Sequence, residues 1–467
     1  MVQFGTAGIR GPVDETVTPS VALRVGNAVG RFAVDTAPAS PPAVVIGRDG
    51  RTTGTTLASA VEAGVSAAGA TPIRCGQLPT PALAFASQGR YGVMLTASHN
   101  PPTDNGLKCF ADGQEFDTDS EAWIETAAES ETVAGYDAWQ SPVRETPLSD
   151  YRAAVVEYVQ QFADAETPCA ALDIAVDCGN GMAALATPQV LTELGAHVIA
   201  LNGNVDGHFP GRPSKPTPET LGDLQQFVAD GTVDLGIAHD GDADRIVILD
   251  SNGEIIHEDT VVAILAGQYT RDSIDDATEQ ETDDPVVVTT PNASARIDET
   301  VTAAGGRVER VRLGALHEGI AGVDTGSVVC AAEPWKHIHP AFGGWIDGVV
   351  SAAMLAHLTA ATGLASLREP ITERPYRKVS VDCPDSAKEP AMATLETSLP
   401  AAFTEATVSL DHGVRLDCPD GSWLLVRPSG TEPYLRLYAE SNAVADLVDT
   451  ATEPIAAAID DATERAD

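Results

Sequence analysis

The sequence has little lysine and little positive charge of any kind. Only five of its 467 residues are lysine, and 28 basic residues face 68 acidic ones, which gives a formal net charge of −40. Proteins that bind nucleic acids need a basic surface to neutralise phosphates, so this composition argues against a nucleic-acid partner. Such a charge repels itself at low salt, whereas molar salt shortens the screening length to about 3 Å. We therefore expect a protein that works in a high-salt cytoplasm.

Paired cysteines and long apolar runs are also missing. The seven cysteines are scattered and include no C-x-x-C pair, which argues against a zinc site and predicts inert thiols in a reducing cytosol. No run of about 18 apolar residues is present, and residues 1–4 do not resemble a signal peptide. We expect neither a membrane partner nor a targeting segment.

Short apolar runs alternate with helical patterns along the chain, which indicates α/β layers. A chain of this length needs more than one hydrophobic core. The expected strands are 44–47, 93–95, 173–177, 197–201, 286–288, 308–311, 327–330, 378–382, 423–426 and 435–439. The expected helices are 55–68, 183–194, 294–304, 347–358 and one at the C-terminus. We predict domains over residues 1–146, 147–252, 253–367 and 368–467, the first three similar α/β units and the last a distinct α+β unit.

One serine follows an apolar strand directly. Residues 96–101 read Thr-Ala-Ser-His-Asn-Pro and come after the strand at 93–95. A lone serine in this position is usually a turn residue. Here the neighbouring residues Thr96, His99 and Asn100 are polar, and Pro101 stiffens the loop. Lys108 could hold a phosphate or help to activate the hydroxyl. Ser98 is therefore a candidate nucleophile.

Three carboxylates stand at alternate positions after another strand. Residues 240–245 read Asp-Gly-Asp-Ala-Asp-Arg. An EF-hand would need Gly at loop position six and Glu at position twelve, and the sequence has Arg245 and Ser251 there. Carboxylate oxygens suit a hard cation such as Mg²⁺. We predict a magnesium site at Asp240, Asp242 and Asp244, with Arg245 available to a phosphate or carboxylate.

Two further segments suit a phosphosugar. In Arg-Pro-Ser-Gly-Thr-Glu-Pro, residues 427–433, side chains and backbone N–H groups can bind an anion, and Arg436 lies nearby in sequence. In residues 332–339, a glutamate can accept from sugar hydroxyls, a tryptophan can stack on a ring and a lysine adds charge. Two alternatives to a sugar-binding loop are open for this segment. Its tryptophan could belong to the core at the end of a strand, or its two histidines could bind a metal.

Taken in order, these segments resemble the α-D-phosphohexomutase superfamily over essentially the whole chain. The similarity rests on the opening Phe-Gly-Thr-Ala-Gly-Ile-Arg-Gly of residues 4–11, the serine loop, the aspartate loop and the loop at 427–433. Ala243 replaces the more usual Gly. The sugar loop departs further: the common form is Gly-Glu-x-Ser-Gly-His, and Trp335 and Lys336 replace its Ser and second Gly.

The resemblance implies four domains in a heart-like arrangement around one cleft, one Mg²⁺, a phosphoserine at Ser98 and a hexose 1,6-bisphosphate as activator. It implies that Arg10 contacts phosphate and that Lys108 and His337 are acid/base candidates. It also implies that the three aspartates and an oxygen of phosphorylated Ser98 hold the metal. The residues expected to bind the sugar and its second phosphate are Arg245, Glu333, Trp335, Lys336, Arg427, Ser429, Gly430, Thr431 and Arg436.

These observations predict a mutase that interconverts hexose or hexosamine 1- and 6-phosphates. The start of the chain resembles the phosphoglucosamine mutase and archaeal phosphohexomutase branches more than the large phosphoglucomutases. We therefore expect a phosphoglucosamine mutase, with a phosphomannomutase or phosphoglucomutase as the alternative. A serine metallophosphatase and a non-catalytic phosphosugar-binding protein are the alternative classes. We expect a monomer or a homodimer.

Overall fold

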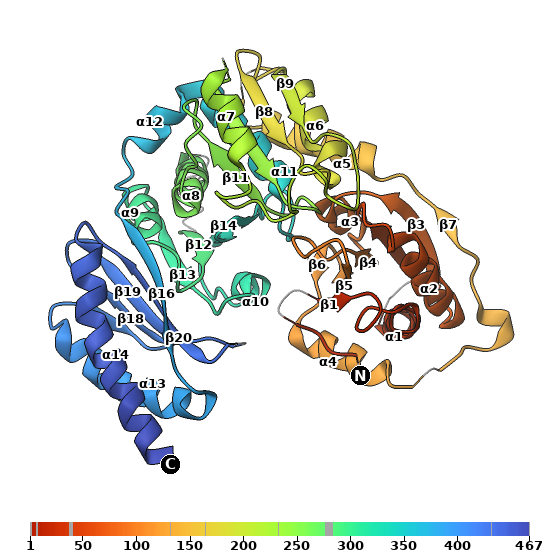
Figure 1. Ribbon diagram of the computed structural model, residues 1–467. Coiled ribbons are helices and arrows are strands. Elements are labelled where there is room, and N and C mark those ends of the chain that lie inside the picture. Colours follow the sequence, from red (N-terminus) through yellow and green to blue (C-terminus); the bar gives the residue numbers. More distant parts are fainter. Residues whose placement is uncertain are drawn as a thin grey trace. The chain divides into compact units, whose positions relative to one another are not determined.

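The computed structural model describes residues 2–5, 8–36, 41–130, 132–163, 165–231, 233–275, 284–430 and 432–466, the last of these without its side chain. The chain forms two compact units (Figure 1). Unit 1 contains residues 1–261 and 329–367, and unit 2 contains residues 262–328 and 368–467. The four predicted domain boundaries stay a prediction, because this division follows contact density and assigns parts of the segment 253–367 to both units.

The first sheet of unit 1 confirms the predicted mixed α/β pattern. Its strands lie in the order β1-β5-β4-β2-β3-β7, and β6 pairs with β5. β2 is parallel to β3 and β4, whereas β5 is antiparallel to β4 and β1. The strands are β1 (Ile9–Pro12), β2 (Ala43–Arg48), β3 (Thr71–Gln77), β4 (Tyr91–Leu95), β5 (Asp104–Ala111), β6 (Gln114–Glu115) and β7 (Val143–Arg144).

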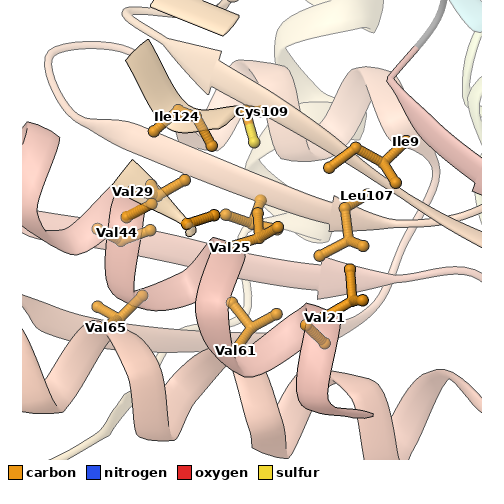
Figure 2. Packing of buried hydrophobic residues seen from close by; sticks show 14 of the residues in the cluster. Ile9, Val21, Val25, Val29, Val44, Val61, Val65, Leu107, Cys109 and Ile124 are labelled. Atoms are coloured by element: carbon orange, nitrogen blue, oxygen red, sulfur yellow. The ribbon is translucent and has the colours of Figure 1, made fainter. Parts of the chain in front are cut away.

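Helices α1 (Pro19–Thr36) and α2 (Gly54–Ala67) pack closely against each other, because glycines lie at their contact. A Cβ on Gly26 would lie 2.4 Å from the Val61 carbonyl oxygen. Valines of both helices meet Val44 and Leu107 of the sheet in one core (Figure 2). Helices α3 (Thr80–Ala86) and α4 (Thr118–Ala127) follow β3 and β6 in the chain. This packed layer fixes the strand ends from which the site loops extend.

The second sheet of unit 1 has the order β11-β10-β8-β9. β8 (Asp173–Asp177) is parallel to β9 (His197–Leu201) and β10 (Leu235–His239), and β11 (Ile246–Leu249) is antiparallel to β10. The βαβ prediction is confirmed, but the single helix expected over 183–194 is wrong. A 3₁₀ turn at Met182–Leu185 ends before α6 (Thr187–Glu193), since Pro188 restricts the preceding residue and cannot donate a helical hydrogen bond.

The other elements of unit 1 complete its layers. The hairpin of β14 (Ser327–Glu333) and β15 (Lys336–Ile338) is followed by the buried helix α11 (Gly348–Thr362), near the predicted bounds. α8 (Glu258–Asp275), β14 and α12 (Leu364–Arg368) cross the division between the units. The remaining elements are a 3₁₀ turn at Tyr136–Ala138, α5 (Leu148–Gln160) and α7 (Gly222–Asp230).

Unit 2 contains a parallel strand pair and a β-rich C-terminal part. β12 (Pro285–Thr289) pairs with β13 (Arg307–Arg310), accompanied by α9 (Ala295–Ala303) and α10 (Leu316–Ala321). An antiparallel sheet follows in the order β16-β20-β19-β18-β17, and α13 (Asp385–Ala402) and α14 (Val444–Ala466) cover one of its faces. Its strands are β16 (Tyr376–Asp382), β17 (Thr407–Ser409), β18 (Val414–Asp417), β19 (Trp423–Pro428) and β20 (Tyr434–Glu440). The other face is free of these two helices.

Candidate active site

Ser98 is held in a strained and fully buried position after β4. Its φ is +49°, a left-handed conformation that is uncommon for residues other than glycine. The Ser98 N–H donates to Thr96 Oγ1 at 2.9 Å, and Ser98 Oγ donates to Asp240 Oδ2 at 2.6 Å. Buried contacts therefore fix the hydroxyl at the aspartate loop, although the two residues are 142 positions apart.

Arg51 holds the serine loop through hydrogen bonds to its backbone. Its buried guanidinium donates to the carbonyl oxygens of Ser98 at 2.9 Å and Asn100 at 2.8 Å, and further to those of Pro101 and Asp104. Arg51 Nε also lies 3.0 Å from Asp49 Oδ2, and that oxygen accepts from Thr96 Oγ1 at 2.7 Å. Sequence analysis missed Asp49 and Arg51; their position directly after β2, beside β4 in the sheet, was the available signal.

The three predicted metal ligands gather after β10. One carboxylate oxygen from each of Asp240, Asp242 and Asp244 lies within 4.8 Å of the others, and all three residues are buried. Thr80 Oγ1 donates to Asp242 Oδ2 at 2.6 Å, and the Thr80 N–H donates to the Asp242 carbonyl oxygen at 3.0 Å. Asp242 Oδ1 and Asp244 Oδ1 are buried, and no described residue donates a hydrogen bond to them. Buried carboxylate oxygens with free lone pairs fit a hard cation such as Mg²⁺.

The charges of this cluster act on each other strongly. Burial, with the charges of Asp244 and Asp242, raises the pKa of Asp240 well above its usual value. Burial would also raise the pKa of Asp244, but Lys108, Lys336 and Arg245 hold it well below its usual value. Buried carboxylates this close repel one another when they are ionised, and a divalent cation between them would offset that repulsion.

The aspartate loop needs small residues at two places. A Cβ on Gly241 would lie 2.6 Å from the Ser98 carbonyl oxygen, so a side chain there would push the two loops apart. Ala243 has a φ of +62°, where a methyl group costs energy that glycine avoids. The positive φ explains why the family motif usually has Gly at this position. With Ala243 the loop is slightly strained.

Cations surround the serine and the carboxylates. Lys108 lies on β5, a strand that sequence analysis did not predict, and its Nζ is 2.8 Å from Asp244 Oδ2 and 3.7 Å from Asp242 Oδ2. Burial alone would lower the pKa of Lys108, but Asp244, Glu115 and Asp242 raise it above its usual value, so the amine is charged. Within the part of the chain that the structure describes, the buried Nε atoms of Arg10 and Arg245 have no hydrogen-bond partner. These groups can receive an anion.

His99 lies beside the candidate nucleophile, Ser98. Its Nδ1 lies 3.4 Å from Ser98 Oγ. Burial, with the charges of Arg245 and Arg10, lowers the pKa of His99 to about 3, so the ring is neutral near pH 7. A neutral imidazole at this distance can accept a hydrogen bond from a hydroxyl near Ser98, but a pKa of about 3 makes it a weak base.

The predicted sugar loop is the tight turn of the β14–β15 hairpin. Trp335 has a φ of +68° at the turn, and its carbonyl oxygen accepts from the Ile246 N–H at 3.2 Å, beside the aspartate loop. Its indole packs against a core cluster that includes Leu224 and Val247, so part of the ring serves the core. Glu333 and Lys336 are opposite each other in the hairpin. The hairpin thus places Lys336 where its charge reaches Asp244.

His337 is buried within the hairpin. Its Nδ1 lies 2.9 Å from Ser351 Oγ, and the same oxygen lies 2.9 Å from His339 Nε2. Burial lowers the pKa of His337 to about 4, so the ring is neutral near pH 7. These contacts give His337 a structural role that competes with the predicted acid/base role.

The predicted phosphate loop forms a separate cluster in unit 2. Arg427 of β19 is directly opposite Arg436 of β20, and the Nε atom of each is buried and has no hydrogen-bond partner among the described residues. Like charges directly opposite each other destabilise a sheet unless an anion offsets them. The Ser429 N–H donates to the Tyr434 carbonyl oxygen at 3.0 Å, and the turn leaves open space beside Gly430. Thr431 lies outside the described residues.

Family models match three parts of the chain. They describe domain I, domain II and the C-terminal domain of phosphoglucomutase/phosphomannomutase, at residues 1–134, 150–253 and 380–457. A phosphopentomutase of Thermococcus kodakarensis is 40% identical over 450 residues, covering 94% of this chain and 93% of that protein. The chain belongs to the phosphoglucomutase/phosphomannomutase family. Family membership confirms the predicted superfamily and makes the protein an isomerase that acts by phosphoryl transfer.

Two further relatives of this phosphoglucomutase/phosphomannomutase family member bear on its substrate and its fold. A probable phosphoglucosamine mutase of Methanopyrus kandleri is 37% identical over 94% of each chain. A crystal structure of a family protein from Burkholderia thailandensis aligns with a TM-score of 0.83, 23% identity and coverage of 99% and 98%. The latter confirms the multi-domain α/β fold. In the described residues, no helix is long and apolar enough to cross a membrane.

Proposed function

We propose that the protein is a phosphosugar mutase with a phosphoserine at Ser98 and one Mg²⁺ at Asp240, Asp242 and Asp244. The observation that supports this most is the 2.6 Å contact between Ser98 Oγ and Asp240 inside a buried cluster of three carboxylates. A phosphoryl group on Ser98 would give the metal one more oxygen ligand. The bound cation would neutralise negative charge during transfer.

In the proposed reaction, the bond between Ser98 Oγ and phosphorus breaks while a sugar hydroxyl oxygen bonds to phosphorus. The hydroxyl proton leaves to a base, and a sugar bisphosphate forms. The bisphosphate turns over, and its other phosphoryl group returns to Ser98. A trace of hexose 1,6-bisphosphate would act as activator by phosphorylating Ser98. Positioning and electrostatics supply most of the rate in such transfers.

We assign proton transfer to groups near Ser98. Neutral His99 is the base that geometry favours, because its Nδ1 is 3.4 Å from Ser98 Oγ. Charged Lys108 is suited to donate a proton or stabilise the transferring phosphoryl group, and Arg10 to hold that group. His337, the second acid/base candidate from the sequence, would instead hold the hairpin through Ser351.

The remaining site residues would hold the substrate. Arg427, Arg436, Ser429, Gly430 and Thr431 would bind the phosphate that does not react, in either orientation of the sugar. We infer this from the opposed arginines, whose guanidinium groups fit a phosphate. Arg245 and Lys336 would add charge at the reacting phosphate. Glu333 would accept from the sugar hydroxyls, and the free part of the Trp335 ring would contact the sugar.

For the sugar we propose glucosamine, because the relative from Methanopyrus is called a probable phosphoglucosamine mutase. A pentose is a second candidate, since the phosphopentomutase from Thermococcus is 40% identical. Mannose and glucose phosphates stay open as the other family substrates. Trp335 and Lys336 in the sugar loop are the residues that we expect to decide between them.

The test is ³¹P NMR of the purified protein with Mg²⁺, molar KCl and a trace of sugar bisphosphate. Glucosamine, N-acetylglucosamine, mannose, glucose and ribose 1-phosphates are offered separately. Conversion of one of them to its terminal phosphate ester, with little free phosphate, supports the mutase and names the sugar. Release of inorganic phosphate that matches substrate loss would instead identify a phosphatase. Binding without turnover would identify a phosphosugar-binding protein.

We also infer that the enzyme works in a high-salt cytoplasm as a monomer or homodimer. The net charge of −40 supports the first point, because screening relieves the self-repulsion of the folded state. Circular dichroism in low and in molar KCl tests it, and a melting temperature that does not rise with salt would contradict it. Light scattering in the same buffers gives the oligomeric state.

A further inference from the structure

A cavity of about 370 Å³ lies between α2 and the strands β2, β3 and β7 of the first sheet. None of the residues assigned above to the reaction lines it. Arg48, Arg74 and Arg144 do, together with Glu62 and Glu145. Three arginines around one cavity are unusual in a chain in which acidic residues outnumber basic ones by 68 to 28.

Each carboxylate of the cavity already has an arginine partner. Glu62 forms an ion pair with Arg74, and Glu145 accepts from both Nη atoms of Arg90, at 3.0 and 2.7 Å. Arg48 and Arg144 have no carboxylate within salt-bridge distance in the described part of the chain. The cavity therefore has two guanidinium groups in excess of its local acidic partners.

Backbone pairing concentrates this positive charge. Arg74 of β3 is the direct partner of Arg144 of β7. Glu62 neutralises Arg74, so Arg144 adds a positive charge beside an ion pair that is already balanced. The β2–β3 pairing also shifts register beside Cys75, and Gly76 follows with a φ of +76° and open space at its Cβ position. Bulges of this kind occur often beside binding sites.

Arg48 is half-buried at the end of β2. Burial lowers its pKa, and only its sequence neighbour Asp49 opposes this effect. Its Nη1 donates to the Asp49 carbonyl oxygen at 3.3 Å, whereas the Asp49 carboxylate faces Thr96 and Arg51. A cation in this state is stabilised by an anion from outside the chain.

We propose that this cavity binds the phosphate or carboxylate group of a small metabolite between Arg48 and Arg144, apart from the reaction centre. Guanidinium groups bind both kinds of oxyanion through paired N–H donors. Ile46 and Ala58 on its wall would contact the apolar part of the ligand. Its volume is at the small end of the range of natural ligand sites, which suits a metabolite of sugar-phosphate size.

The first test is equilibrium dialysis of full-length protein with radiolabelled orthophosphate. Arg144→Gln changes an exposed residue and should fold, and Arg48→Gln is the second variant. Both should lose one phosphate site or weaken it by about tenfold or more. The matched control is Arg465→Gln, an exposed residue paired with Asp461, and it should bind like the wild type. An unchanged number and affinity of sites in both cavity variants would overturn the proposal.

Crystals soaked in tungstate locate the ion independently of activity. A heavy-atom peak between Arg48 and Arg144 that is absent in Arg144→Gln supports the site, whereas peaks elsewhere only would refute it. Competition by citrate separates the two ligand chemistries. If citrate displaces phosphate from the site that Arg144→Gln removes, a carboxylate is accepted there; if it does not, the site is one for phosphate groups. If the wild-type protein has no mutase activity but binds orthophosphate in the cavity, the proposed function is refuted and this inference stands.

Discussion

The cluster around Ser98 and the loop after Arg427 differ in how the chain holds their polar groups. Ser98, Asp242 and Lys108 are buried, and hydrogen bonds or ion pairs hold them in place. At the phosphate loop, the arginines are half-buried and Gly430 is exposed. Each guanidinium donates to a tyrosine hydroxyl, at 3.3 and 3.0 Å, and lies over a tyrosine ring. The difference suggests that the groups we propose to react are positioned before substrate binds, whereas the second loop attracts its ligand through charge.

The strongest test of this comparison is Ser98→Ala. If the buried hydroxyl is the nucleophile, turnover should fall by about 10⁴-fold or more, and covalent phosphate should disappear from the protein. A coupled mutase assay and intact-protein mass spectrometry measure the two effects. Ser149→Ala, at an exposed serine, is the matched control and should retain both activity and phosphate. Mutase activity that persists in Ser98→Ala would disprove the assignment.

Asp242→Asn tests whether the three carboxylates are arranged for a cation. Removing one of them relieves repulsion, so the melting temperature without metal should rise or stay the same. Since a metal ligand is lost, Mg²⁺ should bind about 100-fold more weakly or more, and the rise in melting temperature on adding Mg²⁺ should disappear. Calorimetry and thermal melts measure these effects, with exposed Asp230→Asn as the control. Equal Mg²⁺ stabilisation in both variants would place the metal elsewhere.

Arg436→Gln tests the second region. Loss of one guanidinium should raise KM for the phosphosugar by about tenfold to a hundredfold and leave kcat less affected, because the group binds a phosphate that does not react. Stability should not fall, since the opposed Arg427 loses a like-charged neighbour. The control on the same sheet is Arg377→Gln, an exposed residue of β16. A fall in kcat at unchanged KM would show that this loop belongs to the chemical step.

Sequence patterns pointed to the residues that we propose to react more readily than to the residues that hold them. The Asp-x-Asp-x-Asp run and the serine loop follow apolar strands, so the sequence pattern predicts that both lie at strand ends. Lys108 lies in β5, where Asp104, Asn105 and Lys108 interrupt the apolar pattern, and the strand was missed. Arg51 and Thr80 are far from their partners in sequence. The parallel order of β2 and β4 brings Arg51 to the serine loop, whereas Thr80 after β3 contacts Asp242 after β10, a strand of another sheet.

The hairpin at Trp335 shows a second limit of sequence patterns. A tryptophan in a sugar loop suggested stacking on the substrate, but the positive φ of the turn directs its indole partly onto the core cluster with Leu224. Backbone conformation at a single residue decides this direction, and no composition or spacing rule reports it. The break between Met182–Leu185 and α6 has the same origin, because one proline outweighs an otherwise helical pattern.

The smallest expected effect concerns the rigidity of the aspartate loop. Ala243→Gly removes a methyl group from a residue with a φ of +62°, which should relieve about 1 kcal/mol of strain. The greater freedom of glycine in the unfolded chain opposes this gain, so the net rise in stability should be small. Ala238→Gly, at a buried alanine in β10 that adopts ordinary strand conformation, should lower stability by about 0.5–1 kcal/mol. Thermal melts of both variants without metal give the comparison. If both lose stability equally, Ala243 is not strained, and the loop owes its shape to its contacts with Ser98 and Thr80 instead.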